Sequence, residues 1–190
     1  MDESLVEQVR ARARGCCEYC RMTETAVRLP FQVDHIIAEQ HGGPTILSNL
    51  AWSCLPCNKR KGPNLSGIDR KTRRLVPLFH PRRHAWRRHF RRDGPLLRGR
   101  TPIGRATVQV LGINDRFYVA VRQTLIEEGL VLFDDWGSAP THRPQLDCAV
   151  VGFATPKLCQ LLAKPSERHK SFSTLNFQRR HARFAKIPRH

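Results

Sequence analysis

Two pairs of cysteines, each with two residues between the thiols, constrain this chain more than any other feature. Cys17 and Cys20 form the first pair, and Cys54 and Cys57 form the second. A C-x2-C pair can turn both thiolates toward one tetrahedral zinc ion, so two pairs complete a closed structural site. The 33 residues between the pairs exceed the span of an ordinary zinc ribbon. This length predicts a functional insert that the metal holds at both ends.

The other three cysteines carry less information. Cys16 makes a C-x3-C spacing with Cys20, so it is an alternative to Cys17 as the first ligand. Cys148 and Cys159 have apolar neighbours and no partner motif, and we expect both to be buried thiols. The odd total of seven argues against a closed disulfide set. Because the first residues also lack the basic start and apolar stretch of a signal peptide, we expect a cytoplasmic protein.

The charge balance indicates the class of partner. Lys and Arg total 33 against 16 Asp and Glu, which gives a formal net charge of +17. Such a field attracts polyanions, so we expect nucleic acid as the partner, with DNA first and RNA as the alternative. A membrane is disfavoured because no apolar run approaches ~18 residues and no amphipathic basic helix is evident. No helix pattern indicates dimerisation, and the oligomeric state stays open.

Local patterns predict the elements of residues 1–65, which we interpret as one core with an N-terminal helix. Apolar residues four apart, Leu5, Val9 and Ala13, predict a helix over 3–14 with Ser4 as its N-cap. The further expected elements are a strand at 31–37, a helical turn or extended segment at 48–54, and a helix from Cys57 or Asn58.

Residues 63–100 form the most basic stretch, and residues 66–129 are predicted to be a basic α/β extension of the core. The expected elements are a strand at 75–79, a short helical piece around Trp86, His89 and Phe90, a helix after Thr101-Pro102, and a second helix from about Arg116 to Glu128. Residues 130–190 are basic and interrupted by prolines, and we expect them to be partly disordered.

The insert between the cysteine pairs carries the dipeptide Asp34-His35. On its own, such a dipeptide is more often a surface carboxylate beside a partly buried imidazole. Its context is an ordered series: Cys17-x2-Cys20, Asp34-His35-Ile36, Gly42-Gly43, Ser48-Asn49-Leu50 and Cys54-x2-Cys57-Asn58-x2-Lys61-Gly62. Over roughly residues 15–65 this series resembles the HNH endonuclease family, in its zinc-bearing, four-cysteine branch. The stretches 78–82 and 104–107 resemble extensions found in small bacterial HNH proteins.

The resemblance implies an α+β fold with a ββα-metal, treble-clef-like core stapled by zinc at the four-cysteine site. It implies that His35 is the general base that activates water, because an imidazole can be neutral at physiological pH. Asp34 and Asn58 would hold the catalytic divalent ion. Asn58 stands where the literal motif has a third histidine, and its neutral oxygen favours Mg²⁺ or Mn²⁺ over a second zinc ion.

The resemblance assigns the N of the family name to Asn49, which either holds its loop or orients the His35 ring through a hydrogen bond. The expected phosphate contacts are basic residues around the site, namely Lys59, Arg60, Lys61, Arg82 and Arg83. We expect His41 and His80 to be polar surface residues rather than metal or phosphate contacts.

These features predict a metal-dependent endonuclease that hydrolyses phosphodiester bonds in DNA. Two alternative functions would account for many of the same sequence features. A non-catalytic zinc module that binds nucleic acid needs only the cysteines and the basic charge, and it would bind without cleaving under any divalent ion. An HNH nuclease that cleaves RNA would share every active-site residue, and only parallel assays on DNA and RNA separate it from the first hypothesis.

Overall fold

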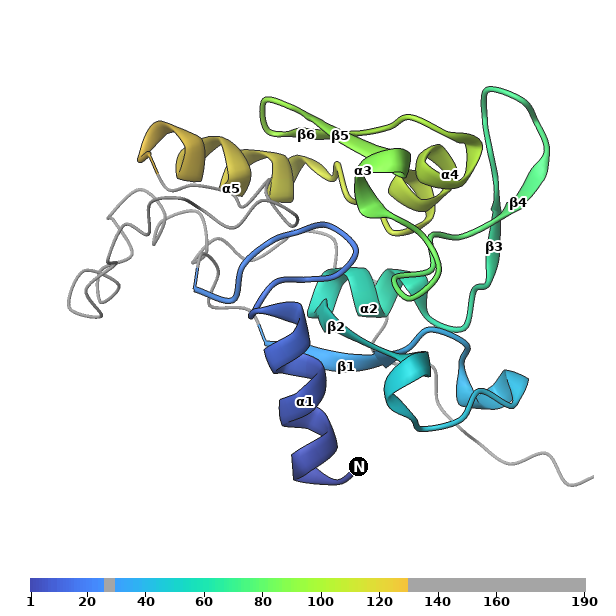
Figure 1. Cartoon of the computed structure of the whole chain (residues 1–190). Coiled ribbons are helices and arrows are strands. Elements are labelled where there is room, and N and C mark those ends of the chain that lie inside the picture. The colour runs from blue at the N-terminus through green and yellow to red at the C-terminus, as the bar shows by residue number, and fades with distance from the viewer. Residues whose placement is uncertain (26–29, 130–190) are drawn as a thin grey trace, which may run out of the picture.

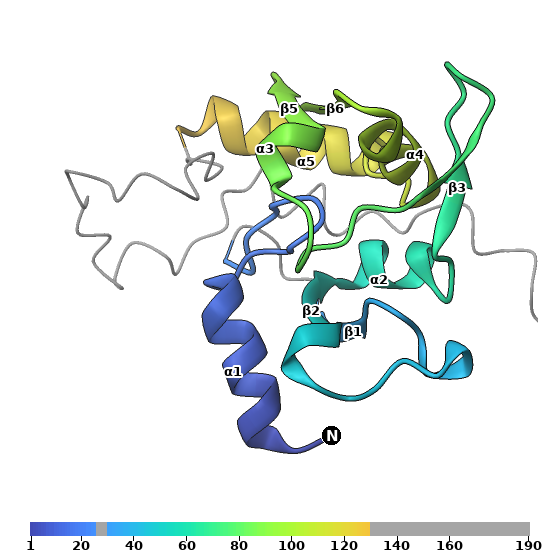
Figure 2. The same cartoon turned by 45° about the vertical axis from the view of Figure 1, so that its right-hand side comes forward.

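The computed structural model describes residues 1–25 and 30–129, and the disorder expected over 130–190 falls outside them. The elements, in chain order, are α1 (Glu3–Ala13), β1 (Phe31–His35), the 3-10 turns η1 (Glu39–His41) and η2 (Leu47–Asn49), β2 (Leu50–Cys54), α2 (Leu55–Lys61), β3 (Ser66–Ile68), β4 (Leu75–Pro77), α3 (Trp86–His89), β5 (Phe90–Asp93), β6 (Leu96–Gly99), α4 (Pro102–Val110) and α5 (Arg116–Glu127). In both views α4 and α5 lie above the β1–β2 hairpin and α2, and α1 lies alongside the hairpin (Figures 1 and 2).

Helix α1 forms where the apolar spacing predicts it, but its cap differs. The Asp2 carboxylate accepts a hydrogen bond from the Ser4 backbone N–H, so Asp2 is the N-cap and the prediction of Ser4 was wrong. A capping side chain must precede the first helical residue, and this helix begins one residue ahead of Ser4. Val9 is buried and packs in one cluster with Trp52 of β2, so α1 covers one face of the hairpin.

Strands β1 and β2 pair antiparallel, with Asp34 opposite Ala51 and His35 opposite Leu50. The strand predicted over 31–37 ends at His35, where the chain turns into the loop that carries η1. Because successive side chains of a strand point to opposite faces, Asp34 and His35 separate. Asp34 is buried on the side of α2, and His35 lies on the other side of the strand.

Helix α2 follows β2 without a linker, since Cys54 is both the last strand residue and the N-cap. It begins at Leu55, earlier than the predicted start at Cys57 or Asn58. Pro56 falls in the first turn, where its missing N–H has no helical partner to lose. The hairpin and α2 together form the predicted ββα core, and the α+β fold class is confirmed.

The extension contains the predicted helices and two hairpins that its sequence pattern did not reveal. Helix α4 is capped by the Thr101 hydroxyl, which accepts a hydrogen bond from the Gly104 N–H. Strand β4 ends at Pro77 rather than at Phe79, because the Phe79 N–H donates to the Thr107 hydroxyl of α4 at 2.8 Å. Strand β3 has only three residues, and the four-residue strands of the β5–β6 hairpin are interrupted by arginines, so neither shows a strand-like alternation.

One hydrophobic cluster joins the ββα core to the extension. Tyr19 and Ile36 pack in the same cluster as Phe79, Phe90 and Leu125. Phe79 and Phe90 meet edge to face, with their ring centroids 5.0 Å apart. The extension is therefore packed directly on the cysteine site that it follows in sequence.

Candidate functional site

The four predicted cysteines converge on one point. The sulfur atoms of Cys17, Cys20, Cys54 and Cys57 lie within 4.8 Å of one another, and all four residues are buried. Cys20 Sγ and Cys54 Sγ are 3.7 Å apart, which matches the roughly 3.8 Å expected between two sulfurs that bind one tetrahedral zinc at about 2.3 Å. The donor set therefore fits a structural zinc ion. Cys16 is not in the cluster, so it is not the first ligand.

Local backbone geometry aims each pair at the metal. In the first pair, the Cys17 N–H donates to the Met22 carbonyl at 2.8 Å, and the Arg21 N–H donates to the Cys17 carbonyl at 2.9 Å. Arg21 takes a left-handed conformation, φ 63°, to close this turn. In the second pair, Cys54 is the N-cap of α2 and Cys57 lies in its first turn, so the two thiols face the same side.

The pKa values of the buried thiols depend on one another. Burial disfavours a charge on Cys17, but hydrogen bonds from Cys20, Cys54 and Cys57 outweigh burial and lower the pKa of Cys17 well below its ordinary value. The hydrogen bond with Cys17 in turn raises the pKa of Cys57. A bound zinc ion would stabilise all four sulfurs as thiolates, so no thiol in the cluster would have to keep its proton.

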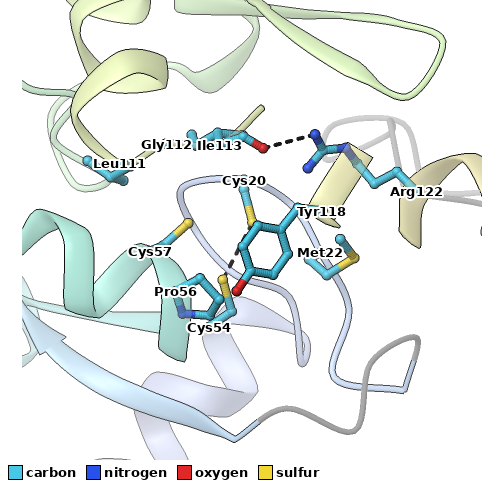
Figure 3. Close-up of a pocket in the computed structure, with 10 residues that line it drawn as sticks. All are labelled: Cys20, Met22, Cys54, Pro56, Cys57, Leu111, Gly112, Ile113, Tyr118 and Arg122. Atoms are coloured by element: carbon cyan, nitrogen blue, oxygen red, sulfur yellow. Dashed lines mark hydrogen bonds between the residues drawn. The ribbon is translucent and has the colours of Figure 1, made fainter. Parts of the chain in front are cut away.

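Helix α5 and the turn before it close the cysteine site from above (Figure 3). Met22, Ile113 and Tyr118 are among the lining residues, and the Tyr118 ring lies beside Cys20 and Cys54. Burial, and then the charge of the nearby thiols, raises the pKa of Tyr118 to about 12, so its phenol stays neutral. This lining would shield a zinc ion held by the four thiolates from water.

Asp34 is enclosed between two polar side chains. It is 4% exposed; the Tyr19 hydroxyl donates to Oδ2 at 2.5 Å, and Lys61 Nζ donates to Oδ1 at 3.1 Å. Burial raises the pKa of Asp34, while the Lys61 charge and the hydrogen bond from Tyr19 act in the opposite direction. The Lys61 ammonium also donates to the backbone carbonyls of His35 at 2.8 Å and Gly62 at 3.2 Å. Lys61 is thus a buried lysine whose ammonium is bonded to three oxygen atoms, one of them on Asp34.

The His35 ring is held on the opposite side of β1 by two residues of the following loop. Its Nε2 lies 2.9 Å from the Thr45 hydroxyl and 3.6 Å from Glu39 Oε1. The Thr45 hydroxyl can donate to Glu39 Oε1 at 3.5 Å. In that arrangement the hydroxyl accepts the Nε2–H, and Nδ1 keeps the lone pair that a general base needs. The sequence pattern indicated neither Thr45 nor Glu39, because both contacts depend on the fold of the loop.

Asn49 closes this loop through backbone groups. Its side-chain nitrogen donates to the carbonyls of Ile37 at 3.0 Å and Pro44 at 2.9 Å, and its oxygen accepts from the Ile37 N–H at 2.9 Å. Of the two roles considered for Asn49, these bonds correspond to holding the loop. Gly43 lies in the same closure, where an added Cβ would fall 1.8 Å from the Ile37 carbonyl oxygen. Only glycine fits at that point.

Asn58 bonds to β1 two residues before Asp34 rather than to Asp34 itself. Its side-chain nitrogen donates to Gln32 Oε1 at 3.1 Å. Gln32 precedes Asp34 by two residues and shares its face of β1, so the two positions are roughly 7 Å apart along the strand. The side chains of Asn58 and Asp34 therefore border the same side of β1, with Lys61 one helical turn beyond Asn58.

The five basic residues expected to contact phosphate fall into two groups. Lys59 and Arg83 are exposed. The other three have internal partners: Lys61 binds Asp34, Arg60 forms an ion pair with Asp115 at 2.9 Å, and Arg82 pairs with the buried Glu18. The structure therefore does not bring the five together as one open patch.

The two histidines expected to be polar surface residues, His41 and His80, have backbone partners. His41 Nε2 lies 3.1 Å from the Pro63 carbonyl, and His80 Nδ1 accepts from the Arg82 N–H at 3.2 Å. Across residues 1–25 and 30–129, the four cysteines are the only group of three or more His, Cys, Asp or Glu side chains close enough to share a metal ion.

The cysteine cluster, the hairpin and α2 define the class of this domain, a ββα-metal fold stapled by a four-cysteine site. Comparison with protein families matches residues 17–64 to the HNH endonuclease model, so this segment is an HNH domain, and its four-cysteine cluster fits the zinc-bearing branch of that family. This family acts on nucleic acids. No curated protein and no solved structure matches the chain. Within the part of the chain that the structure describes, no helix is long and apolar enough to span a bilayer.

Proposed function

We propose that this protein is a metal-dependent endonuclease that hydrolyses phosphodiester bonds in DNA, with His35 as the general base. The observation that carries the proposal is the fixed His35 ring inside an HNH domain. Its Nε2 is engaged by Thr45 at 2.9 Å, which leaves Nδ1 to accept a proton from water. The net charge of +17 supports a polyanionic substrate.

The hydrolysis needs an activated water, stabilisation of the charge on the phosphorus centre, and help for the leaving oxygen. His35 would take the proton from the attacking water at Nδ1. Thr45 and Glu39 would keep the ring in the correct tautomer, and Asn49 would keep the loop that carries them at a fixed distance from β1. Asn49 and Thr45 are positioning residues in this scheme, since their bonds go to protein groups.

Asp34 and Asn58 would hold a catalytic divalent ion, for which Lys61 would have to release Asp34 Oδ1. Because β1 ends at His35, an ion on one side of the strand and a base on the other would meet at the same phosphate. The side chains of Asp34 and Asn58 offer a carboxylate and an amide oxygen on one side of β1, and such hard oxygen donors fit Mg²⁺ or Mn²⁺. When bound, such an ion polarises the phosphate and stabilises the leaving 3′ oxygen. When no divalent ion is bound, the Lys61 ammonium would supply the positive charge beside Asp34, since the buried Asp34 carboxylate requires a cationic partner.

The test is cleavage of supercoiled plasmid by wild type, His35→Ala and Asn58→Ala with Mg²⁺ or Mn²⁺, with bound zinc measured for each protein. We expect one zinc per chain in all three and cleavage by wild type alone. His41→Ala removes an imidazole from the same loop and is the control that should still cleave. Intact plasmid with every protein, or equal cleavage by wild type and His35→Ala, would overturn the proposal. Faster cleavage of single strands or structured RNA in parallel assays would reassign the substrate.

A further inference from the structure

The β3–β4 hairpin with its turn, residues 66–77, forms a projecting element that we call the basic arm. In both views it extends past α4 at the edge of the molecule (Figures 1 and 2). Its turn carries four exposed cations, Arg70, Lys71, Arg73 and Arg74. In the described part of the chain none of the four has an acidic partner. In this they differ from Arg60, Lys61 and Arg82, whose charges are already paired internally.

A buried carboxylate fixes the turn of the basic arm. Asp69 accepts hydrogen bonds from the Lys71 N–H, the Thr72 N–H and the Thr72 hydroxyl. The Arg105 guanidinium of α4 binds both Asp69 oxygens at 2.8 Å. The hydrogen bonds from Arg105, and then those from the turn, lower the pKa of Asp69, so the carboxylate stays charged. The four cations are therefore presented from a preorganised turn rather than from a loose loop.

The two faces of the basic arm differ. The inner face packs on α4 so closely that a Cβ on Gly67 would lie 2.6 Å from the Val110 side chain. The outer face carries Ile68 and Leu75, which are opposite each other in the register and are 52% and 69% exposed. Both side chains are therefore accessible to a ligand bound on the outer face.

We propose that the basic arm is a DNA-binding element that enters the major groove of a duplex, an inference that rests on the proposed nuclease function. The major groove of B-form DNA, about 12 Å wide, admits a two-stranded ribbon. The deep, narrow major groove of A-form RNA does not. Inside the groove the four cations would reach phosphates on both sides. Ile68 and Leu75 would contact thymine methyl groups.

The basic arm is also continuous with the active-site helix. A surface hollow lies between them, and its lining includes Arg70 and Lys71 from the arm and Arg60 from α2. The two acidic residues in the lining, Asp69 and Asp115, are each paired with an arginine. The charges left to face a ligand there are those of the arm. A duplex bound by the arm would thus extend past this hollow toward α2.

The experiment measures binding of a labelled duplex of about 20 base pairs by fluorescence anisotropy, without a divalent ion, from about 50 to about 200 mM salt. The arm variant changes Arg70, Lys71, Arg73 and Arg74 to Gln in the full, zinc-loaded chain. Its control removes the same formal charge elsewhere. There Arg88 of α3, Arg91 and Arg98 of the β5–β6 hairpin, and Arg100 just after β6 are changed to Gln. Each lost phosphate contact lowers the slope of log affinity against log salt by about 0.9.

We expect the arm variant to lose about 3.6 units of that slope and to bind about a hundredfold more weakly, while the control changes affinity by less than about threefold. A second variant, Lys71→Gln with Arg74→Gln, leaves Asp69 and Arg105 untouched and should lose about half of the slope change. Equal binding by the arm variant and the control, or an equal loss on structured RNA, would overturn the proposal.

Hydrolysis of bis(4-nitrophenyl) phosphate separates this inference from the proposed function, since that small diester cannot reach the basic arm from the active site. The arm variant should hydrolyse it at the wild-type rate. If wild type hydrolyses neither the diester nor DNA, the nuclease proposal fails, and the binding data still decide whether the arm binds DNA. A parallel loss of diester hydrolysis and duplex binding in the arm variant would count against a role confined to binding.

Discussion

Replacing Lys61 with methionine is expected to destabilise the domain, because it leaves the Asp34 carboxylate buried without its cation. The side chains of Lys61 and Asp34 are 3% and 5% exposed, and their ion pair measures 3.1 Å. Methionine keeps most of the aliphatic volume of lysine, so the change removes mainly the charge and its hydrogen bonds. Breaking a buried pair by removing one partner costs about 3 to 5 kcal/mol. We take the lower figure, about 3 kcal/mol, because Tyr19 still donates to Asp34.

The destabilisation should depend on pH in a defined direction. Burial already raises the pKa of Asp34, and loss of the Lys61 charge, which opposes burial, will raise it further. An acid whose pKa is higher in the folded than in the unfolded state destabilises the fold as the pH rises from the unfolded to the folded value. The loss of unfolding free energy in Lys61→Met is therefore largest at pH values where Asp34 is ionised in both the folded and the unfolded state. It shrinks as the pH falls, because the protonated acid needs no cation.

The assay is urea unfolding of the zinc-loaded protein between about pH 8 and about pH 5, with Lys59→Met as the matched control. Lys59 is exposed on the same helix, and we expect its replacement to cost less than about 0.5 kcal/mol. At neutral pH, Lys61→Met should lower Tm by about 10 °C. Adding Asp34→Asn to Lys61→Met should recover part of the loss. Equal stabilities of the two lysine variants, or a deficit of Lys61→Met unchanged by pH, would refute the reasoning.

Three further predictions concern the cysteine cluster and the loop between β1 and β2. Cys57→Ser should abolish stoichiometric zinc binding and cooperative unfolding, as measured by metal analysis and circular dichroism, whereas a purely apolar role would leave the fold intact without zinc. Gly43→Ala should cost about 2 kcal/mol or more in urea unfolding, because its Cβ would meet the Ile37 carbonyl; a neutral change would show that the loop adapts. Thr45→Val should lower kcat for DNA cleavage about tenfold and alter its pH profile without changing KM, and Thr45→Ser should restore both. An unchanged profile would remove Thr45 from the orientation of His35.

Part of the site could be predicted from the sequence because its signals are local. The two-residue spacing of each cysteine pair already restricts where both thiols can point, and the structure brings the pairs to one centre. Apolar periodicity likewise indicates α1, and Thr101-Pro102 indicates the start of α4. Helices α1, α4 and α5 appear at the predicted places, although the N-cap of α1 is Asp2 rather than Ser4. Periodicity failed for the β5–β6 hairpin, whose strands have only four residues each.

What only the tertiary structure decided is which of many similar charges are available. Lys59, Arg60 and Lys61 are consecutive cations in the sequence, yet they are respectively exposed, paired with Asp115 and buried against Asp34. The difference arises from partners far along the chain, whose positions depend on packing. The same holds for Thr45, which bonds to His35 only because Asn49 folds the loop. The sequence by itself determined three ligands of the expected zinc site, Cys20, Cys54 and Cys57, since ligand spacing is a local property of the backbone, and the structure chose Cys17 over Cys16 as the fourth. Packing assigned Asp34 to Lys61, His35 to Thr45 and the free cations to the basic arm, because burial and charge pairing are properties of the whole fold.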